Sequence, residues 1–433
     1  MSGPLSRRYR RYRSDHWRRR RRRRQALKLG LVLAMVVAAV VGAVVVLTRG
    51  TDHAEGSPVT PGGQATGKAS ASPSPSPSPS ASPSASPTLP PIPPWTGPAS
   101  YTYRLKLRRV ITGAISSKSV VATQTGRVFA QNMMYRHTMT VYNDRTFKLV
   151  KTIPDSVRLS QFGYKGYSGT VRGAPVEAAV TPDRRFIYVS NYSMYGPGFR
   201  HPGDDNLGPS SGVDPSFVYR INLAKLRIDQ VIKVGSVPKY LAVTPDGRYL
   251  LVSNWTSFNL SVVSTAKGKE LRKVPLGPFP RGIAVDPQSR YAYVAVMGST
   301  NIARIDLRSF KVRWLSGVGS GPRHLCMNST GRWLYVTLNG EGRVGKIDLR
   351  SGRVVAKVAT GSQPRSMAIA PDGKSLYLVN YDSNTVSKIR TDTMRVVQVV
   401  RANPMPIGIT YDYLTRDVWV SCYSGSIMVF DDR

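Results

Sequence analysis

The stretch that decides the fold is residues 238–254, PKYLAVTPDGRYLLVSN, which returns at residues 364–380 as PRSMAIAPDGKSLYLVN. In both copies a short apolar run follows a proline, a Pro-Asp-Gly turn interrupts it, and a second apolar run ends in asparagine. Proline presets the first position of a turn and glycine accepts a positive φ. Each copy therefore predicts two antiparallel strands joined by a tight turn.

The proline that opens each copy recurs along the chain at a nearly constant spacing. Successive opening prolines are 63, 42, 42, 42 and 42 residues apart. A repeat of about 40–45 residues that holds four short strands is typical of one blade of a β-propeller. The opening prolines are Pro175, Pro238, Pro280, Pro322, Pro364 and Pro406.

The repeat extends upstream of the first opening proline. Asn132 aligns with Asn191 and Asn254, which places a further opening at Ser116 and makes seven units. The given sequence ends after the third strand of the last unit, so this unit lacks an outer strand. The run at 105–112 lies just before the first unit and is expected to supply that strand. We therefore expect an all-β fold, a seven-bladed β-propeller with four antiparallel strands per blade, closed by the N-terminal strand so that no sheet edge stays open.

The second strands of the units also carry a family likeness. Residues 188–191, 251–254 and 335–337 read YVSN, LVSN and YVT. The repeat resembles the YVTN-repeat (YncE-like) β-propeller family of surface-layer and envelope proteins over nearly all of residues 101–433. The resemblance implies the architecture. It is less specific for function, because relatives include surface proteins, lactonases and cofactor-carrying redox domains.

A basic tail and an apolar stretch precede the repeats. Residues 1–28 hold twelve arginines, one lysine and one acid, or +12 of the net charge of +38. Residues 29–47 carry no charge, and as a helix they would span roughly 28 Å, enough for the hydrocarbon core of a membrane. Because basic flanks stay cytoplasmic, we expect a single-pass membrane protein with a cytoplasmic N-terminus and an extracytoplasmic propeller. A cleaved export signal and nucleic-acid binding by the arginines are the alternatives.

The segment between the apolar stretch and the propeller has a biased composition. Residues 48–100 show no hydrophobic pattern, and 72–94 consist mostly of Ser-Pro and Ala-Ser-Pro. Such a sequence favours polyproline II, in which it would reach on the order of 70 Å. We expect an extracytoplasmic stalk over 48–100 and the propeller domain over 101–433.

Two units break the 42-residue rhythm. The first carries extra residues around 162–167, and the second carries about twenty, from 195 to 215. The repeat places both insertions on the same face of neighbouring blades. Insertions gathered on one face are typical of a binding face.

The residue after the opening proline is basic in four consecutive units. These side chains would converge near the mouth of the central channel, where they would attract an anion and clamp a carboxylate or phosphate. Inheritance from a common blade sequence is the alternative explanation. The four residues are Lys239, Arg281, Arg323 and Arg365.

Further candidates for ligand binding surround these cations. His324 follows Arg323 and could serve as a base, a ligand or a structural hydrogen-bonding group. Trp255 and Tyr381 lie beside the ends of second strands, where aromatic rings stack on ligands or cover blade edges. The asparagines at those strand ends complete the candidate site: Asn191, Asn254 and Asn380.

The second insertion also holds acidic residues and a histidine. His201, Asp204, Asp205 and Asp214 offer ligand atoms for Ca²⁺, but their spacing matches no known calcium loop. No metal site is therefore expected.

Sequence motifs for catalysis are missing. The chain has no nucleophile elbow, HExxH, CxxC or phosphate-binding glycine loop, and its five histidines do not indicate a haem domain. The sequence predicts a non-catalytic, monomeric binding module without a cofactor, whose partner is an anionic small molecule, an envelope polymer or a protein, and not a nucleic acid. A lactonase-type hydrolase that uses the channel mouth is the alternative that the resemblance implies.

Overall fold

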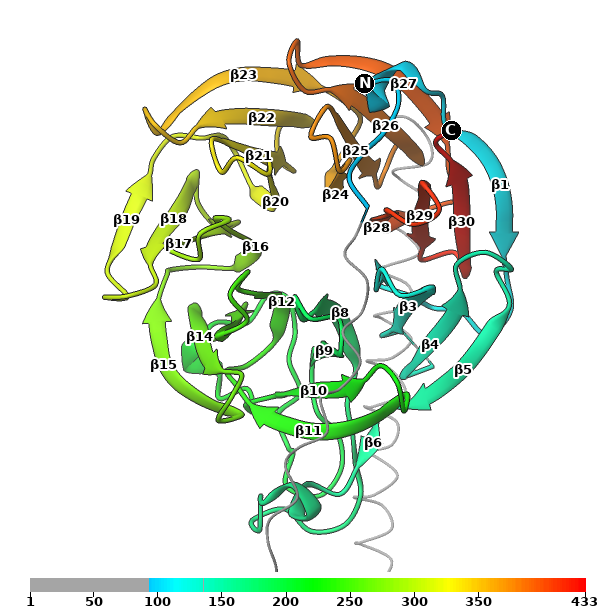
Figure 1. The fold of residues 1–433 in the computed structure, drawn as a ribbon. Coiled ribbons are helices and arrows are strands. Elements are labelled where there is room, and N and C mark those ends of the chain that lie inside the picture. Colours follow the sequence, from blue (N-terminus) through cyan, green and yellow to red (C-terminus); the bar gives the residue numbers. More distant parts are fainter. Residues whose placement is uncertain (1–92, 135) are drawn as a thin grey trace, which may run out of the picture. The chain divides into compact units, whose positions relative to one another are not determined.

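The computed structural model describes residues 93–134 and 136–433, which form seven four-stranded antiparallel sheets arranged as blades around a central channel (Figure 1). In every blade the strands follow one another outward from the channel. Each of the six opening prolines begins an inner strand. The predicted seven-bladed propeller is therefore confirmed.

The strands of the blades have the following bounds. Blade 1 has β2 (Ser119–Ala122), β3 (Arg127–Asn132), β4 (Thr138–Asn143) and β5 (Leu149–Pro154). Blade 2 has β8 (Pro175–Val180), β9 (Phe186–Asn191), β10 (Phe217–Asn222) and β11 (Arg227–Lys233). Blade 3 has β12 (Pro238–Val243), β13 (Tyr249–Asn254), β14 (Asn259–Ser264) and β15 (Lys269–Pro275). Blade 4 has β16 (Pro280–Val285), β17 (Tyr291–Val296), β18 (Asn301–Asp306) and β19 (Val312–Leu315). Blade 5 has β20 (Pro322–Met327), β21 (Trp333–Leu338), β22 (Arg343–Asp348) and β23 (Arg353–Ala359). Blade 6 has β24 (Pro364–Ile369), β25 (Ser375–Asn380), β26 (Thr385–Arg390) and β27 (Arg395–Arg401). Blade 7 has β28 (Pro406–Asp412), β29 (Asp417–Cys422) and β30 (Ser426–Asp431), with β1 (Lys106–Ile111) as its outer strand.

The ring closes where the two ends of the domain meet. Strand β1 pairs antiparallel with β30, from Lys106 opposite Asp431 to Ile111 opposite Ile427, and the two lie side by side in Figure 1. Arg108 on β1 adds a bidentate ion pair to the buried Asp417 of β29, with Nη1 3.1 and 2.9 Å from its two oxygens. The predicted closure by an N-terminal strand is confirmed.

The asparagine that ends a second strand stabilises the blade. The Nδ2 group of Asn380 donates to Thr385 Oγ1 and Ser387 Oγ on the third strand, and its Oδ1 accepts from the backbone N–H of Gly361. A Cβ on Gly361 would lie 2.8 Å from the Asn380 side chain, so the close approach requires glycine. The recurring glycine and asparagine are therefore partners in one interblade contact.

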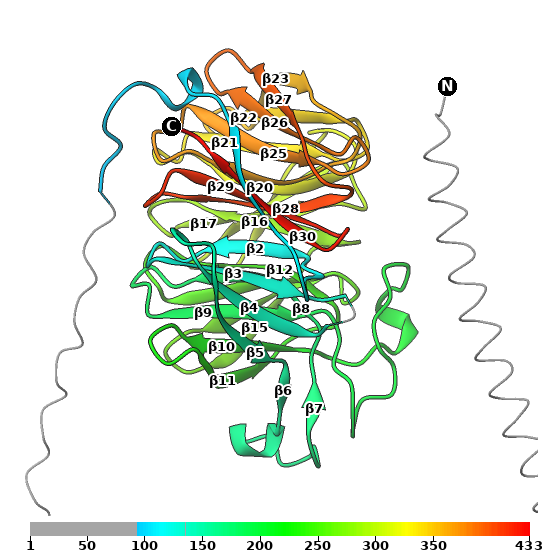
Figure 2. The ribbon, with the colours of Figure 1, turned by 90° about the vertical axis from the view of Figure 1, so that its right-hand side faces the viewer.

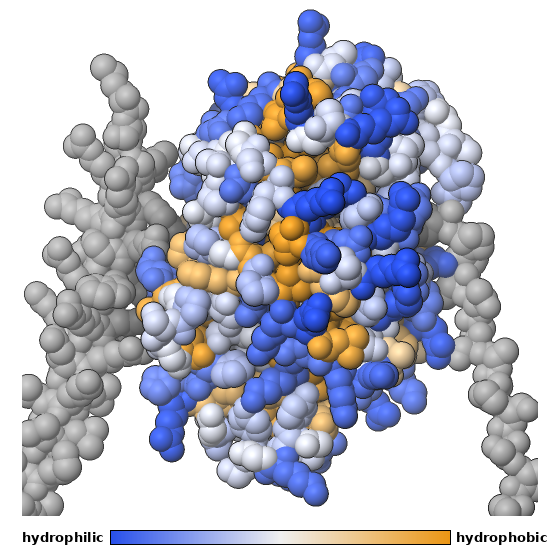
Figure 3. Space-filling view, turned by 90° about the vertical axis from the view of Figure 1, so that its left-hand side faces the viewer, coloured by the Kyte–Doolittle hydropathy of each residue, from blue (hydrophilic) through white to orange (hydrophobic). Residues whose placement is uncertain are grey.

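The hydrophobic core lies between neighbouring blades. Leu251 and Val262 of blade 3 pack with Ile283 and Val294 of blade 4, for example, and all four are at most 3% exposed. On the outer rim, hydrophilic side chains surround smaller apolar areas (Figure 3). Exposed large apolar side chains such as Leu271 are scattered over the outer strands, as is common for soluble domains.

The two insertions pack on each other beside blade 2. The first holds β6 (Ser156–Val157), η2 (Leu159–Phe162) and β7 (Val171–Arg172), and the second holds η3 (Pro209–Ser211). Tyr167 of the first stacks on Phe199 of the second, with ring centroids 5.0 Å apart. Figure 2 shows β6 and β7 projecting from the ring. The predicted proximity of the two insertions is confirmed.

The predicted basic tail (1–28), transmembrane helix (29–47) and most of the stalk (48–100) lie outside the described residues. Within the described part of the chain, no helix is long and apolar enough to cross a membrane. Just before the propeller, η1 (Ser100–Thr102) contacts blade 6, where the backbone N–H and the hydroxyl of Ser100 both donate to Asp372.

Candidate functional site

Charged side chains gather at one end of the channel, where the inner strands begin. The first residues of β12, β16, β20 and β24 after their opening prolines supply the four predicted cations. The start of blade 1, the third residue of β8 and the second insertion add three more charged residues. We call this group the mouth cluster. Its members are Lys118, Glu177, Asp205, Lys239, Arg281, Arg323 and Arg365.

Glu177 is the buried anion of the mouth cluster. Its Oε1 atom lies 3.3 Å from Lys118 Nζ and 3.8 Å from Arg281 Nη2. Arg281 also donates from Nη1 to the backbone oxygen of Lys239 at 2.7 Å. All four side chains are buried, so one carboxylate offsets two cations and the arginine ties blade 4 to blade 3.

Asp205 reaches the mouth cluster from the second insertion. Its carboxylate forms an ion pair with Lys239 and accepts a hydrogen bond from the Tyr192 hydroxyl at 2.8 Å. The indole Nε1 of Trp255 donates to the backbone oxygen of Asp205 at 3.0 Å. Burial acts to raise the pKa of Asp205, but Lys239 outweighs it, so the pKa lies below its usual range. This carboxylate is charged at neutral pH and holds the insertion against the mouth.

Arg323 and Arg365 are the two cations of the mouth cluster without an ion-pair partner among the described residues, and Arg323 also lacks a hydrogen bond to an oxygen acceptor there. Arg323 is 7% exposed, and its Nη1 contacts the Met297 sulfur at 3.8 Å. No carboxylate among residues 93–134 and 136–433 lies within ion-pair distance, 4.0 Å, of its guanidinium. Burial, followed by Arg281 and Arg365, lowers the pKa of Arg323 well below its usual value.

Aromatic side chains hold two of the cations in place. The Arg365 guanidinium lies 3.5 Å from the centroid of the Tyr381 ring and donates from Nη2 to Gln363 Oε1 at 3.0 Å. Lys239 Nζ lies 4.8 Å from the centroid of the Trp255 ring. These contacts are cation–π interactions. Trp255 and Tyr381 therefore contact cations of the mouth cluster, whereas the sequence had suggested that they stack on a ligand or cover blade edges.

The basic groups of the mouth cluster repel one another, and this repulsion adds to burial in lowering the pKa values of its two lysines. Burial, opposed by Asp205 and assisted by Arg281, lowers the pKa of Lys239 to about 8. Burial and Arg281 lower the pKa of Lys118 well below its usual value. The mouth cluster holds five basic residues and two carboxylates among the described residues, and the excess positive charge would be relieved by a bound anion.

His324 lies further along the channel than the mouth cluster. The side chain is buried, and its ring stands edge-on to Tyr240 with centroids 5.1 Å apart. Burial, Arg281 and Arg323 lower the pKa of His324 to about 3. The imidazole is therefore neutral at physiological pH.

The predicted asparagines do not join the site. Asn191, Asn254 and Asn380 are fully buried, and their amides donate within their own blades, to Phe217 O, Ser261 Oγ and Ser387 Oγ for example. We correct their role from ligand binding to blade stabilisation. Their recurrence at the same place in several units was the signal for a structural role.

Sequence reasoning missed Lys118 and Glu177, and it considered Asp205 only as a possible Ca²⁺ ligand and not as the partner of Lys239. Lys118 and Glu177 stand two positions after their unit openings, where the other units carry Tyr, Gly, His or Ser, so charge at that position was a usable signal. Asp205 belongs to an insertion without a repeat and gave no such signal. Its neighbour Asp204 accepts a hydrogen bond from the backbone N–H of Asn206 and organises the loop.

No group of three or more metal-ligating side chains occurs among the described residues.

Comparisons with known proteins match the chain in part. A family model described as the cytochrome D1 heme domain matches residues 323–413, which begin in β20 and end after β28. Among solved structures, hydrazine synthase from Kuenenia stuttgartiensis is similar with a TM-score of 0.59 and 19% identity, over 74% of this chain and 96% of that chain. At this identity the likeness shows the β-propeller fold alone. The comparison with curated proteins gave no match.

Proposed function

We propose that this protein is a binding module that holds an anionic ligand at the mouth cluster of its propeller. The observation that carries the proposal is Arg323, a buried guanidinium between two other arginines without a carboxylate within ion-pair distance among the described residues. A buried unpaired charge costs several kcal/mol. A carboxylate or phosphate beside Arg323 would remove that cost and accept bidentate hydrogen bonds.

The rest of the mouth cluster supports a specific binding mode. Lys118 and Lys239 have carboxylate partners at or within 3.3 Å. Arg281 lies 3.8 Å from its shared carboxylate, and Arg323 and Arg365 have none within ion-pair distance among the described residues. We therefore assign the incoming anion to the arc of these three arginines. These residues come from the inner strands of three adjacent blades, whose rigid pairing fixes the positions of the three guanidinium groups. Rigid placement favours recognition of a defined anionic group over diffuse attraction of any polyanion.

A haem is the group that the family match suggests, and the described residues do not fit it. Haem iron needs an axial His, Cys, Met or Tyr, and the channel cavity is lined by residues of all four types, so its size and access decide the fit. The cavity measures about 340 Å³, near the lower end of the range of about 300–1,000 Å³ for small-molecule sites. Haem is a large cofactor, and Tyr240 covers the edge of the imidazole. We derive no step through a haem.

Hydrolysis of the lactonase type has less support. A general base works best when its pKa lies near the operating pH, whereas the pKa of His324 is lowered to about 3 by burial and nearby arginines. We therefore propose binding without catalysis. We also propose that the basic tail and apolar stretch of residues 1–47 anchor the module in a membrane, so that the mouth cluster meets its ligand outside the cell.

Thermal shift of the full-length chain tests the proposal. Inorganic phosphate, citrate and a poly(glycerol phosphate) would be added separately in low-salt buffer. A ligand at about a hundred times its dissociation constant adds roughly 2.7 kcal/mol of stability. We expect at least one probe to raise the melting temperature and Arg281→Met to weaken that effect. No shift with any probe, or equal shifts in both proteins, would refute it.

A further inference from the structure

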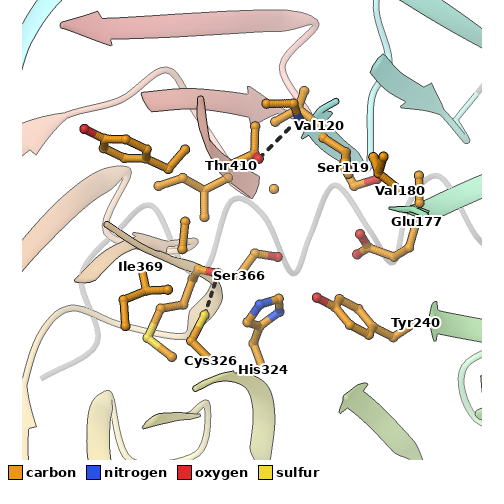
Figure 4. A pocket seen from close by; sticks show the side chains of 18 of the residues that line it. Ser119, Val120, Glu177, Val180, Tyr240, His324, Cys326, Ser366, Ile369 and Thr410 are labelled. Carbon is orange, nitrogen blue, oxygen red and sulfur yellow. Dashed lines mark hydrogen bonds between the residues drawn. The ribbon is translucent and has the colours of Figure 1, made fainter. Parts of the chain in front are cut away.

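A separate cavity lies in the channel beyond the mouth cluster. Its volume is about 340 Å³, and the inner strands of several blades line it. Polar groups gather at the end nearer the mouth cluster, where Figure 4 shows His324 between Ser366 and Tyr240. Apolar side chains line much of the remainder: Val120, Val180, Leu325, Met367, Ile369 and Ile409.

Gly282 explains how the two rings at the polar end meet. A Cβ on Gly282 would lie 2.7 Å from the backbone oxygen of Arg323 and 2.8 Å from His324 Cα. Blade 4 therefore contributes no side chain at this level. Tyr240 of blade 3 and His324 of blade 5 approach across the gap, with an angle of 89° between their ring planes.

The charges around the polar end favour an anionic group. Among the described residues that line the cavity, Glu177 is the one with a charged side chain at neutral pH, and Lys118 and Arg281 offset it at 3.3 and 3.8 Å. Burial is the main reason why the pKa of His324 is low, and the nearby Arg281 and Arg323 lower it further. A positive potential disfavours an ammonium head group, while the hydroxyl groups of Tyr240 and Ser366 can donate hydrogen bonds to a carboxylate.

We propose that this cavity is a second binding site, for a small monocarboxylate with an apolar body. Its carboxylate accepts hydrogen bonds from the hydroxyl groups of Tyr240 and Ser366 beside the neutral His324 ring, and its hydrocarbon part packs between Val180 and Ile369. The site differs from the mouth cluster in chemistry, because its lining combines polar groups with apolar side chains and Glu177 is its one charged residue among the described residues. The proposal of a second site does not depend on whether the mouth cluster binds an anion.

Calorimetric titration of the full-length chain with three matched probes tests this site. The probes are hexanoate, hexanol and hexylammonium, which share a hydrocarbon body and differ in the head group. We expect hexanoate to bind with one-to-one stoichiometry, hexanol to bind at least tenfold more weakly and hexylammonium not to bind. Equal affinities for the three probes, or no binding of hexanoate, would overturn the proposal.

Variants locate the binding in the cavity. Tyr240→Phe keeps the ring and removes one hydroxyl, so hexanoate affinity should fall several-fold. Ala368→Leu, which adds bulk to the lining, should reduce it at least tenfold. Arg353→Met is the matched control, because Arg353 is exposed at the start of the outer strand β23 and has no role in either proposed site, and it should leave hexanoate affinity within twofold. Unchanged binding in both cavity variants would overturn the assignment.

Haem titration supplies an independent outcome. The proposed cavity is too small for a tetrapyrrole, so added haemin should give no saturable Soret band that depends on His324. A Soret band that saturates at one haem per chain and shifts in His324→Ala would show that the channel accepts a macrocycle. That result would replace the monocarboxylate site with a haem site.

Discussion

Replacing Arg323 by methionine should make the ligand-free protein more stable. Arg323 is 7% exposed, faces Arg281 and Arg365, and contacts the Met297 sulfur at 3.8 Å. Methionine has a similar length and would pack against Met297 without carrying charge. Replacing buried charged groups by apolar residues of similar size is often neutral or stabilising by about 1–4 kcal/mol.

The gain is measurable as a change in melting temperature. A stability change of 1 kcal/mol shifts the melting temperature by about 2–4 °C in domains of 150–250 residues and by less in larger ones. We therefore expect Arg323→Met to melt at least about 2 °C above the wild type in a low-salt zwitterionic buffer. The assay is differential scanning calorimetry of the full-length chain, without added phosphate or polycarboxylate.

A control separates the effect of charge burial from that of any lost arginine. Arg353 is exposed at the start of β23, so Arg353→Met should change stability by less than about 0.5 kcal/mol. A large loss of stability in Arg323→Met, with Arg353→Met unchanged, would show that Arg323 is well compensated in the free protein. The reasoning from an unpaired buried cation would then be wrong.

Three further predictions concern pH and ring closure. The affinity for an anion should fall as pH rises through about 8, because Lys239 loses its proton there. Calorimetric titrations with the anion at pH 6.5 and 9.5 should show this fall in the wild type but not in Lys239→Met. Because the unfolded lysine keeps its proton to about pH 10.4, the unfolded state binds more protons between these values, and this residue should make stability rise with pH in that window. Burial and Asp144 raise the pKa of Asp412 to about 7, so the folded state holds an extra proton between about pH 4 and 7. The free energy of unfolding should therefore fall as pH rises across that window. Asp144→Asn removes the repulsion and should melt at a higher temperature than the wild type at pH 8. Deleting residues up to Thr112 removes β1 from blade 7. That chain should melt at a much lower temperature than one that begins after Pro98. Equal melting temperatures would contradict the role of β1 in closing the ring.

The blade architecture could be read from the sequence because it depends on local, repeated chemistry. The opening proline, the turn and the terminal asparagine each act within one unit or between neighbours, as the Gly361–Asn380 contact illustrates. The missing strand of blade 7 could be assigned to 105–112 because an open edge is unfavourable. The structure places that strand at Lys106–Ile111.

The candidate site was only partly predictable. The repeat placed Arg281, Arg323 and Arg365 at equivalent positions, and their convergence followed from the ring. Which mouth cations have an anionic partner depends on two other residues. Glu177 of blade 2 lies beside Arg281, and Asp205, whose loop has no counterpart in other blades, pairs with Lys239. Such contacts are set by the tertiary structure, and one sequence carries no periodic signal for them.

The most direct test of the anion-binding proposal is isothermal titration calorimetry of the full-length chain with citrate in low-salt buffer. We predict a saturable heat with one citrate per chain in the wild type, and loss of that heat in Arg323→Met while Arg353→Met still binds. If citrate, and inorganic phosphate in a parallel titration, give no saturable heat, or if Arg323→Met binds as tightly as the wild type, the mouth cluster is not an anion site.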